Sequence, residues 1–92
     1  MRKSGRILVA DDEKAQREIL VSSLEKRGYE VSGAGDLKAA LKMYDQGLQE
    51  QNPFHTVVTD LRMPTDKEGL ELLKHVREED PLCEVILVTA IA

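Results

Sequence analysis

The chain has 92 residues, a formal net charge of −4 and a pI near 5.1, which allows one small domain and argues against a basic nucleic-acid-binding surface. No apolar stretch could span a bilayer and the first residues lack a signal-type apolar core, so we expect a cytoplasmic protein without membrane partners. The single cysteine, Cys83, precedes an apolar run and is expected to be a reduced, partly buried packing residue.

Short apolar runs alternate with amphipathic segments along the chain. The runs predict strands at about residues 6–10, 29–32, 56–59 and 84–89. Apolar positions at helical spacing predict helices at about 13–27, from 37 into the polar stretch 46–52, and from 65 to about 80. This alternation predicts an α/β fold with a parallel sheet and right-handed crossovers.

Local signals mark the ends and faces of these helices. Gly28 is expected to follow the end of the first helix, and Asp36 to cap the start of the second. Thr65 followed by Glu68 fits a capping box for the third helix. The expected packed side of the first helix consists of Ala15, Ile19, Leu20 and Leu24.

Three aspartates directly follow predicted strands. Asp11 and Asp12 come after the first strand, and Asp60 comes after the third. In doubly wound sheets, ligands bind beyond the carboxyl ends of the strands, so we expect these carboxylates to share one crevice. Taken singly, an aspartate can instead cap a helix or open a turn, and Thr89 can simply be a β-former at a strand end. Together they favour a functional site.

Other motifs fail at specific positions. Residues 33–35 (Gly-Ala-Gly) begin like a dinucleotide fingerprint, but Lys38 stands where the third glycine is needed. His55 is expected to open the third strand and His75 to lie on a solvated helix face, and with one cysteine they form no zinc-ligand pattern. A phosphatase of the haloacid dehalogenase type needs an acid where Arg62 stands, which leaves it as a third alternative.

The combined pattern resembles the receiver domain of bacterial two-component response regulators. The matching motifs are Asp11-Asp12, Asp60-Leu61-Arg62-Met63-Pro64 and Thr89-Ala90, within residues 6–90. The resemblance implies a flavodoxin-like, doubly wound parallel sheet with strand order 2-1-3-4 in this chain and a fifth strand in the full family. It implies a signalling protein, not an enzyme. The amino-acid sequence that begins at Asp60 is most similar to that of receivers in ATPase-type transcriptional regulators.

The resemblance also implies a chemistry. A sensor histidine kinase would donate a phosphoryl group to Asp60, a carboxylate that needs no general base because it is ionised at neutral pH. Asp12 and Asp60 would bind Mg²⁺ directly, Asp11 mainly through water, and the main-chain carbonyl of Arg62 would complete the protein ligands. Thr89 would be the switch residue that hydrogen-bonds the phosphoryl group.

The loop after Asp60 and the segment expected after Thr89 can also be compared with the family. Pro64 would shape the loop after Asp60. A receiver normally continues through a fifth βα unit that carries a lysine beside the phosphoryl group, and no lysine follows Thr89 here. We therefore interpret residues 1–92 as a C-terminally incomplete receiver domain without its output domain, and we favour a piece of a longer regulator over a natural stand-alone remnant.

The predicted fourth strand has a further consequence for partners. Residues 85–88 are Val-Ile-Leu-Val, a sequence suited to an interior strand, and as a bare edge they predict self-association, as a homodimer or through exchanged elements. The alternative function is accordingly a non-phosphorylated interaction or dimerisation module with the same fold.

Overall fold

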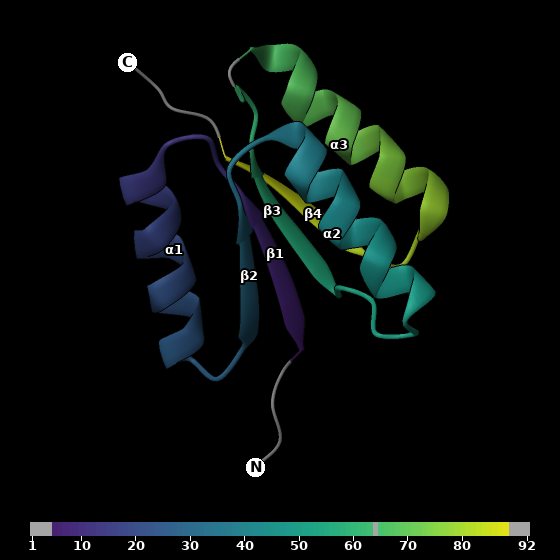
Figure 1. The fold of residues 1–92 in the computed structure, drawn as a ribbon, viewed down its shortest axis with the longest axis horizontal. Coiled ribbons are helices and arrows are strands. Elements are labelled where there is room, and N and C mark those ends of the chain that lie inside the picture. The colour runs from purple at the N-terminus through teal and green to yellow at the C-terminus, as the bar shows by residue number, and fades with distance from the viewer. Residues whose placement is uncertain (1–4, 64, 89–92) are drawn as a thin grey trace.

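The structure is a computed structural model that describes residues 5–63 and 65–88. Its elements follow in the order β1 (Arg6–Ala10), α1 (Lys14–Lys26), β2 (Glu30–Ala34), α2 (Leu37–Gln49), β3 (Thr56–Asp60), α3 (Asp66–Glu79) and β4 (Glu84–Val88). Within the described residues the strands form one parallel sheet in the order β2-β1-β3-β4. Helix α1 lies on one side of the sheet and helices α2 and α3 on the other (Figure 1). The predicted flavodoxin-like, doubly wound fold is confirmed.

The main core lies between the sheet and the α2–α3 pair. Its buried side chains are Leu8, Ala10, Ala34, Ala40, Tyr44, Phe54, Val57, Met63, Leu72, Val76 and Cys83. Cys83 is 4% exposed, which confirms the packing role expected for it. None of the helices in the described part of the chain is long and apolar enough to cross a membrane.

Several predicted boundaries are wrong by a few residues. Strand β2 begins at Glu30 and extends to Ala34, because its parallel register with β1 pairs residues 30–34 with residues 6–10. Helix α2 extends into the polar stretch, as predicted, and continues through Gly47 to Gln49. A Cβ at Gly47 would lie 3.0 Å from the carbonyl oxygen of Asn52, so this glycine permits a close approach and does not break the helix.

The predicted helix caps are present. The Asp36 carboxylate accepts a hydrogen bond of 2.7 Å from the N–H of Ala39. Thr65 and Glu68 form the predicted capping box at the start of α3. Gly28 follows the end of α1 with a φ of +97°, a conformation that favours glycine.

The predicted packed side of α1 is partly wrong. Ala15 is exposed and the Ile19 side chain is 65% exposed, whereas Leu20 and Leu24 are half-buried. The helix packs mainly against β2, and side chains of the helix lie 3.4 Å from the position that a Cβ of Gly33 would occupy. The stripe that faces the sheet is therefore rotated away from Ile19.

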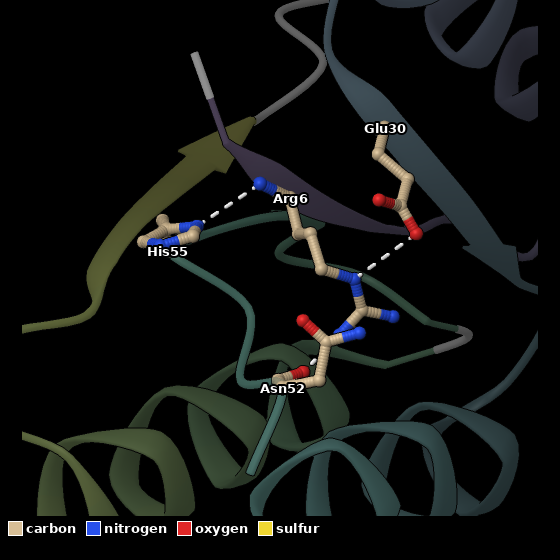
Figure 2. A network of polar contacts seen from close by, with 4 residues as sticks. All are labelled: Arg6, Glu30, Asn52 and His55. Atoms are coloured by element: carbon tan, nitrogen blue, oxygen red, sulfur yellow. Dashed lines mark hydrogen bonds and ion pairs between the residues drawn. The ribbon is translucent and has the colours of Figure 1, made fainter. Parts of the chain in front are cut away.

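A polar network ties the amino ends of the strands together, and Figure 2 shows it around Arg6. The Arg6 Nε lies 3.3 Å from a carboxylate oxygen of Glu30, and the guanidinium also donates to the carbonyl of Asn52. The same guanidinium stacks 4.3 Å from the centre of the Phe54 ring. The main-chain N–H of Arg6 donates to Nδ1 of His55 at 3.0 Å. This network links β1, β2 and the segment before β3.

His75 joins the two helices that cover the core. Its Nε2 lies 2.7 Å from a carboxylate oxygen of Asp45, and its ring meets the Tyr44 ring edge-on at 5.9 Å. The expectation of a solvated face residue is therefore wrong, because α2 and α3 lie side by side and the histidine bridges them.

Candidate functional site

An acidic cluster lies at the carboxyl ends of β1 and β3. Asp11 and Asp12 directly follow β1, and Asp60 is the last residue of β3. Because β1 and β3 are neighbours in the sheet, one carboxylate oxygen from each aspartate lies within 4.8 Å of the others. Asp11 is 2% exposed, Asp60 is half-buried and Asp12 is exposed. The structure thus brings the three predicted acids together in a site open to solvent.

Asp11 is held in place by hydrogen bonds on three sides. Its main-chain N–H donates to the carbonyl of Ala34 on β2 at 3.0 Å. Its carboxylate accepts from the N–H of Glu13 at 2.9 Å, and its carbonyl accepts from the guanidinium of Arg17 at 2.7 Å. The strand end is therefore anchored to both β2 and α1.

Asp60 is positioned by the turn that follows it and by the start of α3. Its carboxylate accepts from the N–H of Arg62 at 3.2 Å. Gly69 brings the first turn of α3 against the same segment, with its N–H donating to the carbonyl of Leu61 at 3.2 Å. A Cβ at position 69 would lie 2.4 Å from that carbonyl oxygen and 2.7 Å from that of Asp60, so only glycine fits here without a shift of the main chain.

The electrostatics of the cluster favour a cation. Burial raises the pKa of the Asp11 carboxyl, the hydrogen bond from Glu13 opposes this, and the charges of Asp60 and Asp12 raise the pKa further. Clustered carboxylate oxygens are the donor set of hard divalent cations, and Mg²⁺ in particular keeps several waters when it binds. A buried acid beside two acids accessible to water fits that requirement.

Of the other three predicted site residues, the structure describes only Arg62. Arg62 lies two residues past Asp60 with its main-chain N–H turned to the Asp60 carboxylate. Pro64 and Thr89 lie outside the described residues. The sequence analysis missed Arg17 as a neighbour of the site, and it gave no reason for Gly69. The feature of the sequence that could have indicated Arg17 is the pair of glycines at 33 and 35, which leaves space beside the end of β2 for a long side chain.

Comparisons with known proteins agree with this geometry. The family model of the response regulator receiver domain matches residues 7–92. The response regulator receiver protein CpdR of Brucella abortus is 38% identical over 87 residues, which cover 95% of this chain and 68% of CpdR. The DNA-binding transcriptional regulator NtrC of a Bradyrhizobium species is 34% identical over 87 residues, 95% of this chain but only 17% of NtrC.

Solved structures with the same fold have known binding partners. The response regulator TrrA of Thermotoga maritima, solved in complex with Mg²⁺-BeF, has a TM-score of 0.80 and 34% identity over all of this chain and 72% of its own. TrrA in complex with the histidine kinase ThkA has a TM-score of 0.78 with the same identity and the same coverage of both chains.

Proposed function

The chain belongs to the family of response regulator receiver domains, and from this premise we propose that Asp60 accepts a phosphoryl group from a sensor histidine kinase in a Mg²⁺-dependent reaction. The observation that carries the proposal is the convergence of Asp11, Asp12 and Asp60 from two neighbouring strand ends within 4.8 Å. A relative with the same fold, TrrA, has been solved both with Mg²⁺-BeF and with a histidine kinase.

The residues of the cluster have separate roles in this proposal. Asp12 and Asp60 bind Mg²⁺ directly, Asp11 contributes mainly through water, and the main-chain carbonyl of Arg62 supplies a further oxygen. When bound, Mg²⁺ neutralises charge on the transferring group and on the carboxylates. A carboxylate oxygen of Asp60 attacks phosphorus, the O–P bond forms as the P–N bond of the kinase phosphohistidine breaks, and the released imidazole takes up a proton.

Two further roles come from the family resemblance. Thr89 is the proposed switch residue, whose hydroxyl hydrogen-bonds the new phosphoryl group and moves the following segment. Pro64 is proposed to fix the loop after Asp60. The phosphorylated state then alters a docking surface for an output domain, and relatives such as NtrC and the alginate regulator AlgB of Pseudomonas aeruginosa are transcriptional regulators.

Intact mass measures the proposed reaction directly. The folded chain is incubated with a small acyl phosphate, with and without Mg²⁺, and a gain of one phosphoryl group is expected only with the metal. Asp60→Asn should show no gain. Asp36→Asn is the matched control, because it removes an exposed carboxylate that is not part of the cluster and keeps a capping side chain. A folded wild-type sample that gains no mass would contradict the proposal.

A second candidate function rests on the edge of the sheet. In the described part of the chain β4 pairs with β3 alone, and the side chains of Ile86 and Leu87 are 51% and 38% exposed. We propose that the 92-residue polypeptide self-associates through this edge. Light scattering should give a mass that grows with concentration for the wild type and for Ile19→Lys, a control at another exposed apolar residue. Ile86→Lys should remain monomeric. A monomeric wild type at high concentration would overturn this candidate.

A further inference from the structure

Arg17 extends from α1 across the end of β2 to the acidic site. Its side chain is half-buried, and its Nη1 donates a hydrogen bond of 2.7 Å to the main-chain carbonyl of Asp11. That carbonyl belongs to the peptide unit that joins Asp11 to Asp12. The guanidinium therefore holds the peptide plane that orients Asp12, the exposed member of the cluster, which lies beyond the last paired residue of β1.

The Gly-Ala-Gly sequence at the end of β2 provides the space for this side chain. A Cβ at Gly35 would lie 3.0 Å from Arg17 Nη1, and a Cβ at Gly33 would lie 3.4 Å from its Cγ and Cδ. Among the glycines that the structure describes, only Gly5 and Gly28 have a positive φ. The backbone at positions 33 and 35 thus does not require glycine. At position 35 a Cβ would crowd Arg17, whereas at position 33 it would make only ordinary contacts with Arg17 and Val21.

Ala34, the residue between these glycines, receives the other main-chain bond of Asp11. The N–H of Asp11 donates to the Ala34 carbonyl at 3.0 Å while its carbonyl accepts from Arg17. The two peptide units on either side of Asp11 are therefore fixed by different partners, β2 on one side and α1 on the other. Removing Arg17 leaves the peptide before Asp11 bonded to β2, but takes away the side-chain hydrogen bond that restrains the peptide leading to Asp12.

We propose that Arg17 is a positioning residue for the metal site, which sets the Mg²⁺ affinity by orienting the Asp11–Asp12 peptide. This inference rests on the proposed function, because it assumes that the cluster binds Mg²⁺. A hydrogen bond from a charged donor is stronger than a neutral one, and loss of a partner that orients metal ligands typically costs 10–100-fold in metal affinity. Arg17 acts through Asp11 and Asp12 and is not itself a ligand.

The test is a Mg²⁺ titration of the full chain. Calorimetry measures the affinity, and the amide NMR signals of Asp11 and Asp12 report on their main chain. Arg17→Met keeps the apolar stem but no donor, and we expect its Mg²⁺ affinity to fall by about tenfold. Arg17→Lys keeps one charged donor and should recover part of the loss. Arg27→Met removes an exposed arginine at the other end of α1, and its affinity should stay within about twofold of the wild type. Circular dichroism confirms that each variant is folded.

A double substitution separates positioning from general stability. Gly35→Ala should weaken Mg²⁺ binding by pushing against Arg17, yet cause no further loss when added to Arg17→Met, because the side chain that it displaces is then absent. Additive losses would overturn the inference, as would a folded Arg17→Met protein that binds Mg²⁺ like the wild type. These outcomes leave the proposed function intact, whereas a folded wild type that binds no Mg²⁺ would overturn both.

Discussion

Replacing Gly69 by alanine should destabilise the domain and disturb Asp60. Helix propensity alone favours alanine by about 1 kcal/mol. However, the added methyl group would lie 2.4 Å from the Leu61 carbonyl oxygen and 2.7 Å from both the Leu61 Cα and the Asp60 carbonyl oxygen. These are main-chain atoms, so either α3 or the end of β3 must move. Overpacking costs typically about 1–3 kcal/mol. With the upper value, the expected net loss is about 2 kcal/mol.

Thermal unfolding followed by circular dichroism measures this effect. A loss of that size corresponds to a fall of roughly 10 °C in Tm for a domain of this length. Gly33→Ala is the matched control, because its Cβ would meet only side-chain atoms, at 3.4 Å, and its Tm should change little. The Gly69→Ala protein should also take up less phosphoryl group at a given Mg²⁺ concentration. If it were more stable than the wild type, as propensity alone predicts, the close approach of α3 to the site would be refuted.

Three other substitutions or treatments test the same structure. In EDTA at neutral pH, Asp11→Asn should raise Tm by a few degrees. Burial and the charges of Asp60 and Asp12 raise the pKa of Asp11, so the stability that this group contributes is fully present below pH 3.8 and is lost as the pH rises through the folded-state pKa. An unchanged Tm would contradict this cost of burying the charged carboxylate. Burial raises the pKa of Cys83 to about 11. Iodoacetamide at pH 7.5 should therefore modify the folded protein roughly a hundredfold more slowly than the urea-unfolded protein, as measured by intact mass. Equal rates would mean that the thiol is accessible in the folded protein. Asp36→Ala removes the hydrogen bond from the N–H of Ala39 that caps α2, and it should lower the free energy of unfolding in urea by about 1 kcal/mol. Asp36→Ser should keep most of that stability. An equal loss in both variants would argue against the cap.

The strand order came from the resemblance to receiver domains, but the convergence of the acids at one edge of the sheet could be predicted from the sequence for a simple reason. Parallel strands all end at one edge of the sheet, so any residue that directly follows a buried strand is carried to that edge. Asp11 and Asp60 meet this condition, and the neighbouring positions of β1 and β3 bring them together. The caps at Asp36 and Thr65 were equally predictable, because a capping bond spans only two or three residues along the chain.

Features that depend on packing between distant segments could not be predicted in this way. The amphipathic pattern of α1 placed Ile19 on its packed side, but which part of the stripe is covered depends on the strand opposite, and Gly33 offers no side chain there. In the same way, nothing near His75 in the sequence indicates a partner for it, and it links the two helices only because α2 lies beside α3 and Asp45 on α2 comes within 2.7 Å of its ring.

The glycines of this chain show why the support of the site stayed hidden. Glycine occurs either where φ is positive or where another group comes too close for a Cβ, and the sequence does not distinguish the two cases. Gly28 belongs to the first class, with a φ of +97° and nothing within 4 Å of its Cβ position. Gly69 and Gly35 belong to the second class, and each admits a group that holds one side of the acidic cluster: the start of α3 beside Asp60, and Arg17 beside Asp11. The acids alone therefore do not define the site, and a chain that kept all three aspartates but carried larger residues at 35 and 69 should bind Mg²⁺ poorly.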